Sequence, residues 1–223
     1  MQINGHLCFK IWELGIPKLN SILVRTTTSR PFFMVEKLIL HIQSIVPINE
    51  EEVEIIRELV KEKDVPRKKF LHQAGEVASY SAFVVEGCLR SYTVDRDGFE
   101  HIVQFAPENW WISDMYSLVK NKPSELNIDA LLESKVLLLS RTCQVSIFDR
   151  IPKLERYFRI LSENALAASN QRTINYLSLT AKLRYEKFCD LYPTLIHSIP
   201  QKSIASYIGI TPEFLSKLRA ERN

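Results

Sequence analysis

One stretch constrains this chain most: from about Lys153 to about Ser178 it contains neither glycine nor proline. Such a stretch predicts one continuous helix, because no helix-breaking residue interrupts it. Five of its residues follow a 4-3-4-3 spacing and share one seam: Leu154, Phe158, Leu161, Ala165 and Ala168. A seam of this kind packs either on the protein's own fold or on a second copy of the same helix. Because its small residues would let a partner backbone come close, we favour a dimer interface over plain core.

The segment before this helix changes from a helical to a strand-like pattern. INEEEVEIIRELVKEK (48–63) begins with Asn49 and has Glu52 three residues later, which is a capping-box arrangement. Apolar residues then recur at helical spacing, so we expect an amphipathic helix over this segment. From Val65 to about Arg141 the chain consists of short apolar runs broken by turn residues, with Asp97-Gly98 as a hairpin turn. These runs predict antiparallel strands in a small sandwich or barrel-like roll.

Helical patterns return after the predicted strands. A short helix from Val145 to Arg150 stops before Pro152, and a further one over residues 181–193 ends at Pro193. The expected fold class is therefore α+β, with an antiparallel roll, a long helix and a small helical end.

The C-terminal stretch QKSIASYIGITPEFLSKLRAERN predicts two short helices that meet at Gly209. Glycine adopts the left-handed conformation of a helix end without steric cost. Thr211 can cap the second helix and Pro212 fits its first turn. In the first helix Lys202, Ser203 and Ser206 fall outside the apolar arc, and in the second Phe214, Leu215 and Leu218 are expected to face inward.

Two helices at a steep angle around one glycine form a helix-turn-helix, whose second helix fits the major groove of DNA. Lys217 suits guanine or a phosphate, Glu213 accepts from a cytosine amino group, and Ser216 can do either. The alternative is an ordinary helical hairpin at a chain end. The candidate DNA-binding residues are Thr211, Pro212, Glu213, Ser216, Lys217, Arg219, Arg222 and Lys202.

Charge and cysteine content narrow the class of protein. The formal net charge is +3, and the segment from Lys182 onward carries all of it, with seven Lys/Arg against four Asp/Glu. A nucleic-acid site would thus be local. The four cysteines are far apart and without metal-ligand spacing, so we expect reduced thiols in the cytoplasm and no bound metal. No apolar run reaches the roughly 20 residues of a membrane span, and residues 1–33 lack the features of a secretory signal.

Several motifs in this order resemble the Crp/Fnr family of bacterial transcription regulators. They are HQAGE (72–76), AFVVEGCLRSY (82–92), FAPENWWISDMYSL (105–118) and IPQKSIASYIGITPEFLSKLRAERN (199–223). The resemblance implies a cyclic-nucleotide-binding-like roll over 34–152, a dimerisation helix over 153–180 and a helix-turn-helix domain over 181–223. Residues 1–33 are expected to be an N-terminal extension that is translated only from an upstream start.

The resemblance also implies a homodimer on a roughly palindromic double-stranded DNA site, with RNA polymerase as a further partner. Gly75 and Gly87 stand at the family's roll turns, where the backbone needs positive φ. On the recognition helix, Pro212 replaces the family's usual arginine, Glu213 matches its glutamate and Lys217 replaces a second arginine. The proline leaves the family's best-known operator in doubt.

Family members that bind cyclic AMP contact its ribose with a glutamate and its phosphate with an Arg-Ser pair. In this sequence Asp114 occupies the position of that glutamate, and Ser124-Glu125 occupies the position of the Arg-Ser pair. A buried phosphate needs a cation or several backbone donors, and Glu125 would oppose it. We therefore expect no cyclic AMP and no cofactor, with an apolar or aromatic effector as the alternative to plain aromatic core. The candidate effector-pocket residues are Trp111, Asp114, Met115, Tyr116, Ser124 and Glu125.

Two other classes compete with a DNA-binding regulator. An enzyme would draw on His72, His101, Asp114 or Glu125, but no catalytic spacing, phosphate loop or HExxH motif accompanies them. A ligand-binding or protein-interaction module would use the terminal helices only to dock a partner. We expect a non-enzyme with no catalytic residues.

Overall fold

The structure is a computed structural model that describes residues 31–220, with side chains from residue 34. The chain begins there with helix α2 (Pro31–Gln43), followed by α3 (Glu50–Leu59). The N-terminal extension predicted for residues 1–33 lies almost entirely outside the described residues.

Helix α3 begins as the sequence predicts and ends earlier. The Asn49 side chain accepts from the Glu52 N–H, and the Glu52 carboxylate accepts from the Asn49 N–H, which confirms the capping box. The helix was expected to reach residue 63, but strand β1 (Val60–Val65) begins directly after Leu59. Val60 pairs with Leu139 of strand β8 (Ser134–Ser140). Pairing with a neighbouring strand overrides the local helical preference here.

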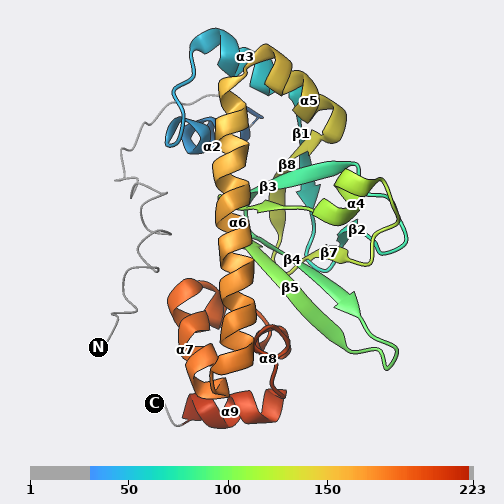
Figure 1. Cartoon of the computed structure of the whole chain (residues 1–223), viewed down its shortest axis with the longest axis vertical. Coiled ribbons are helices and arrows are strands. Elements are labelled where there is room, and N and C mark those ends of the chain that lie inside the picture. Colours follow the sequence, from blue (N-terminus) through green and yellow to red (C-terminus); the bar gives the residue numbers. More distant parts are fainter. Residues whose placement is uncertain (1–30, 221–223) are drawn as a thin grey trace.

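Two four-stranded antiparallel sheets form the roll, in the orders β1-β8-β3-β6 and β2-β7-β4-β5 (Figure 1). The remaining strands are β2 (Phe70–His72), β3 (Tyr80–Glu86), β4 (Cys88–Val94), β5 (Glu100–Pro107), β6 (Trp111–Ile112) and β7 (Asn127–Ala130), and the short helix α4 (Met115–Lys120) follows β6. Buried aliphatic side chains from both sheets share one core, which includes Val84, Leu89, Ile128 and Val136. The predicted roll is confirmed.

Glycines occupy the turns of two predicted strand–turn–strand units. Gly98 has φ +83° at the β4–β5 turn, and Gly87 has φ +89° between β3 and β4. A Cβ at Gly87 would collide with the carbonyl oxygen of Glu133. Gly75 also has positive φ, at +91°. The roll turns therefore require glycine where the resemblance implied it.

Helix α5 (Arg141–Arg150) begins four residues before the predicted start, because Ser140 caps it by accepting from the Cys143 N–H. Helix α6 (Lys153–Ser178) has the predicted bounds and runs beside the roll from one end of the molecule to the other (Figure 1). The residues of its predicted seam differ in burial between the first and the second half of the helix. Leu154 is 1% exposed within the chain's own core, and Phe158 and Leu161 pack against that core.

The dimer-interface prediction is thus wrong for Leu154, because this residue belongs to the chain's own core, together with residues of α2, α5 and the first sheet. Ala165 and Ala168 are exposed, and for them the prediction stays a prediction.

The C-terminal helices are α7 (Ala181–Leu191), a short 3-10 turn (Leu195–His197), α8 (Gln201–Ile208) and α9 (Pro212–Ala220). They share one apolar core with the roll, to which Cys88, Ile102 and Phe105 contribute from the strands. Helix α8 lies against β5, where Ser206 Oγ donates to the Glu100 carbonyl at 2.6 Å and accepts from the Ile102 N–H at 3.0 Å. The helical end is therefore packed on the β4–β5 hairpin.

Candidate functional site

The α8–α9 corner has the predicted geometry. Gly209 has φ +71° and ψ +47°, and it ends α8 in the left-handed conformation. Thr211 Oγ1 accepts from the Phe214 N–H at 3.2 Å in the first turn of α9. Leu215 is fully buried and Leu218 is 8% exposed, so these two leucines attach α9 to the core. The two helices are thereby fixed around one residue, as in a helix-turn-helix.

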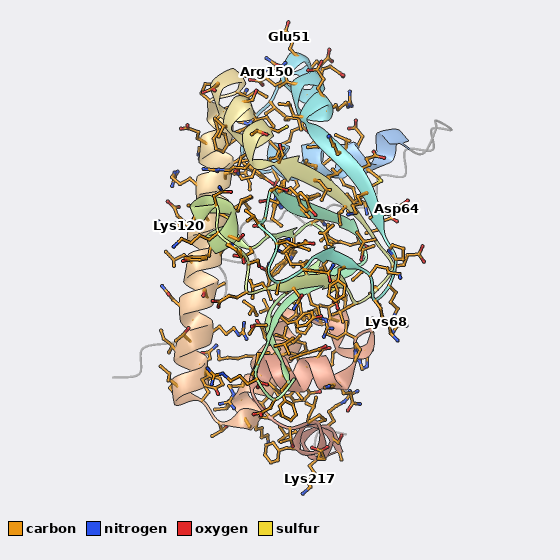
Figure 2. The ribbon with its side chains drawn as sticks, turned by 90° about the vertical axis from the view of Figure 1, so that its right-hand side faces the viewer. Glu51, Asp64, Lys68, Lys120, Arg150 and Lys217 are labelled. Atoms are coloured by element: carbon orange, nitrogen blue, oxygen red, sulfur yellow. The ribbon has the colours of Figure 1, made fainter. Side chains whose placement is uncertain are left out.

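The outer strip of α9 consists of five exposed residues: Pro212, Glu213, Ser216, Lys217 and Ala220. Lys217 extends away from the body at the end of the molecule (Figure 2). Hydrogen bonds from its own backbone N–H and from the Thr211 hydroxyl lower the pKa of Glu213, which favours the carboxylate. The strip therefore offers one cation and one anion, with no bulky group between them.

Several predicted residues of the corner are placed differently from expectation. Phe214 was expected to face inward and is 44% exposed, because Leu215 and Leu218 already fill the space beneath the helix. Ser203 was expected outside the apolar arc and is 5% exposed; Arg90 Nη1 donates to its hydroxyl at 3.4 Å. Ser206 was also expected outside, but it bonds to β5.

The flanking basic residues differ in exposure. Lys202 is exposed and Arg219 is half-buried. Arg222 lies outside the described residues.

Two arginines that no sequence pattern identifies hold the corner. Arg184 on α7 donates through Nε to the Ile208 carbonyl at 2.8 Å and through Nη1 to the Leu179 carbonyl at 3.0 Å. It thereby satisfies carbonyls at the C-terminal ends of both α8 and α6, which would otherwise lack partners. Its guanidinium also lies 5.2 Å from the ring centroid of Tyr176.

Arg172 on α6 makes the second such link. It donates to the Ile102 carbonyl of β5 at 2.7 Å and to the Tyr207 carbonyl of α8 at 3.4 Å, and its guanidinium lies 4.1 Å from the Tyr207 ring centroid. One side chain thus joins the long helix, the roll and the helix-turn-helix. Such arginines can be identified only once the positions of the backbone carbonyls are known, because their partners carry no sequence pattern.

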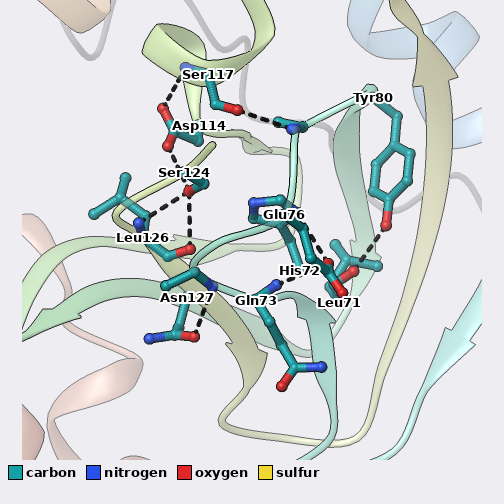
Figure 3. Close-up of polar contacts among 12 residues, drawn as sticks. Leu71, His72, Gln73, Glu76, Tyr80, Asp114, Ser117, Ser124, Leu126 and Asn127 are labelled. Atoms are coloured by element: carbon teal, nitrogen blue, oxygen red, sulfur yellow. Dashed lines mark hydrogen bonds and ion pairs between the residues drawn. The ribbon is translucent and has the colours of Figure 1, made fainter. Parts of the chain in front are cut away.

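The candidate effector pocket contains a buried polar cluster around Asp114 (Figure 3). Asp114 is 5% exposed, and its carboxylate accepts from the Ser117 N–H at 3.0 Å and from Ser124 Oγ at 2.6 Å. The Ser124 hydroxyl also accepts from the Leu126 N–H at 2.9 Å. Ser117 Oγ accepts from the Ala78 N–H and donates to the Lys122 carbonyl. The polar atoms of this cluster are used within the chain.

The remaining candidate pocket residues do not gather at Asp114. Trp111 Nε1 donates to the Tyr157 hydroxyl at 2.9 Å, and its ring packs on Phe83 and Phe158. Met115 and Tyr116 are 54% and 61% exposed on α4, and Glu125 is exposed. The aromatic group of the sequence is thus divided between the core and the surface, because Trp111 lies on strand β6 against the core whereas Met115 and Tyr116 lie on the outer side of helix α4.

The candidate enzyme residues are also dispersed. His72 is buried with its Nδ1 3.7 Å from Glu76, whereas His101 is exposed and lies 2.6 Å from Asp95. Within residues 31–220, no group of three His, Cys, Asp or Glu residues could hold a metal ion. Among the helices described, none has the length and apolar character that a membrane crossing demands.

The sequence matches no family model and no curated protein. Solved structures do match. FixK2 from Bradyrhizobium japonicum is 19% identical, covering 73% of this chain and 83% of that protein, with a TM-score of 0.64. The c-di-GMP responsive regulator CLP from Xanthomonas campestris is 11% identical, covering 78% and 91%, with a TM-score of 0.62.

A protein from Eubacterium rectale described as a transcriptional regulator of the Crp/Fnr family is 13% identical, covering 78% of this chain and 83% of its own, with a TM-score of 0.62. With its roll, long helix and terminal helix-turn-helix, the chain has the fold of the Crp/Fnr-type regulators.

Proposed function

We propose that the protein is a DNA-binding transcription regulator that acts as a homodimer on a palindromic operator and does not respond to cyclic AMP. The observation that carries the proposal is the α8–α9 corner, with its buried leucines and its exposed strip around Lys217. The proposed DNA-contacting residues are Thr211 at the start of α9 and Pro212, Glu213, Ser216 and Lys217 on it, with Lys202, Arg219 and Arg222 on phosphates.

The dimer part of the proposal is supported by apolar groups on α6. Leu166, Ile174 and Leu177 are 63%, 54% and 79% exposed. Large apolar side chains grouped on one helix commonly mark an interaction surface. The helical spacing of these three residues puts them on the face of α6 opposite Leu154, so the proposed main interface is this outer face rather than the predicted seam. Ala165 and Ala168 lie on the Leu154 side of the helix, and a contact through them remains a separate prediction.

A two-fold dimer presents two recognition helices, and two half-sites about one turn of DNA apart form a palindrome. Leu166→Asp introduces a charge into the proposed interface, so it is expected to give monomers in sedimentation velocity. Val145→Asp, at a position 48% exposed on α5, is the matched control and is expected to remain dimeric. If Leu166→Asp also sedimented as a dimer, the interface would not include this face of α6.

The lack of response to cyclic AMP is proposed from the cluster around Asp114. Its carboxylate already accepts from Ser117 and Ser124, and the neighbouring Glu125 opposes a phosphate. Calorimetric titration with cyclic AMP is expected to show no heat of specific binding. Saturable binding would contradict this part of the proposal alone.

The DNA-binding part is tested by selection of bound duplexes from a random pool, followed by affinity measurement at several salt concentrations. A regulator is expected to enrich an inverted repeat and to lose affinity steeply as salt rises. If no duplex is bound above background at low salt, a ligand-binding or protein-interaction module replaces the regulator. Action with RNA polymerase in the cytoplasm is the expectation for such a regulator.

A further inference from the structure

Phe214 is an exposed aromatic residue on the helix that carries the outer strip. Its side chain is 44% exposed, whereas the neighbouring Leu215 is fully buried. Its N–H donates to Thr211 Oγ1, so it belongs to the first turn of α9, the part of a recognition helix that contacts base edges. Leu215 and Leu218 already attach α9 to the core, so packing of the corner does not require this ring.

Phe214 lies beside Lys217 on the helix surface. Residues three apart are neighbours, with about 5–6 Å between their Cβ atoms. Successive base pairs are about 3.4 Å apart along the DNA axis. Side chains at these two positions therefore reach base pairs that are at most about two steps apart.

The opposite flank of the outer strip is less available for recognition. There Ser216 Oγ donates to the Pro212 carbonyl at 2.9 Å, so its hydroxyl hydrogen is already used within the helix. Arg219 is half-buried. The freely exposed reading groups are thus Glu213, Phe214 and Lys217, which the helical spacing puts side by side.

Only one base presents an apolar group in the major groove, which is thymine with its C5-methyl. We propose that Phe214 determines specificity by contacting the methyl group of a thymine within two base pairs of the guanine that Lys217 contacts. The inference rests on the proposed function, because it requires α9 to enter the major groove. It adds a sequence requirement that the charged residues alone do not impose.

The test uses the full chain and the duplex enriched from the random pool. Each thymine is replaced in turn by deoxyuridine, which lacks the methyl group and keeps the same base-pairing edge. Wild-type protein is expected to lose about fourfold in affinity at one thymine of each half-site, the effect of about one buried methyl group. Phe214→Ala is expected to bind the thymine and deoxyuridine duplexes equally.

Two matched variants accompany this measurement. Phe70→Ala removes a ring that is similarly exposed, at 45%, on strand β2, and it is expected to keep the fourfold discrimination. Lys217→Ala is expected to weaken binding to both duplexes by the same factor. Wild-type protein that ignores deoxyuridine at every position, while still selecting a duplex, would overturn the role of Phe214 and leave the proposed function intact. Failure to bind any duplex would overturn both.

Discussion

The cluster around Asp114 and the outer strip of α9 contain similar residues in opposite states. In the cluster, a carboxylate and two serine hydroxyls are buried and bond to one another and to backbone groups. On the strip, Glu213 and Lys217 are exposed and directed to solvent. Buried polar groups are satisfied by their own chain because a missing partner is costly, whereas exposed ones remain available to a ligand. Residue type alone therefore does not identify a binding site.

A second buried cluster is closed in the same way: the Tyr157 hydroxyl accepts from Trp111 Nε1 and is hydrogen-bonded to His41 Nδ1 at 2.8 Å. Burial lowers the pKa of His41 to about 4. The unfolded chain takes up this proton near pH 6.5, so the contribution of neutral His41 is present above that pH and lost as pH falls toward 4. Between pH 7.5 and 4.5 wild-type protein is expected to lose about 2–3 kcal/mol more than His41→Gln.

Urea denaturation at the two pH values measures this difference. His197→Gln, at an exposed position, is expected to behave as wild type. If wild type and His41→Gln lost equal free energy of unfolding between the two pH values, burial of His41 would not lower its pKa.

The Asp114 cluster itself is tested by Asp114→Ala. The substitution leaves the Ser117 N–H without its acceptor and removes the shorter of the two bonds that the Ser124 hydroxyl can donate, since the Leu126 carbonyl at 3.0 Å remains. The free energy of unfolding is therefore expected to fall by about 2 kcal/mol. Glu125→Ala, at an exposed position next to the cluster, is expected to change stability by less than about 0.5 kcal/mol. DNA affinity per folded molecule is expected to be the same in both variants. A selective loss of affinity in Asp114→Ala would make the cluster part of a signalling site.

The corner that presents the strip is tested by Gly209→Ala. Both Gly209→Ala and Gly98→Ala force alanine into positive φ, which costs about 1 kcal/mol. A Cβ at Gly209 would also lie 2.6 Å from the Tyr176 ring and displace it from Arg184, adding about 0.5–1 kcal/mol, whereas the space at Gly98 is open. In thermal denaturation, Gly209→Ala is therefore expected to have a lower midpoint temperature than Gly98→Ala. The opposite order would exclude the contact with Tyr176 as a support of the corner.

The strip itself is tested by Lys217→Ala. Because this side chain lies outside the buried arc, stability is expected to change by less than about 0.5 kcal/mol. Specific DNA affinity is expected to fall about tenfold, the effect of one base contact of about 1.4 kcal/mol. Fluorescence anisotropy with the selected duplex measures it. A stable variant with unchanged affinity would remove Lys217 from the reading group.

Local patterns predicted the elements of this fold well. The Asn49 capping box, the bounds of α6 and the Gly209–Thr211 corner each depend on residues close together in sequence, and the structure confirms them. The end of α3 was wrong because strand β8, some 75 residues further on, pairs with Val60. Pairing of this kind depends on tertiary context rather than local propensity.

The site was predicted less completely for the same reason. Helical spacing predicted that Phe214 faces inward with Leu215 and Leu218, which is wrong, because only the actual packing of the two leucines decides that the Phe214 ring stays exposed. Leu154 lies on a plausible seam, but it is buried in a core shared with α2, α5 and the first sheet. Arg172 and Arg184 act on backbone carbonyls, which carry no sequence pattern.

The position of α9 on DNA is measured most directly by dimethyl sulfate protection of the selected duplex. This reagent methylates guanine N7 in the major groove and adenine N3 in the minor groove. If the outer strip lies in the major groove, guanines at two positions about one helical turn apart are expected to be protected by wild-type protein and reactive again with Lys217→Ala. Bound duplex with every guanine N7 still reactive would contradict the account.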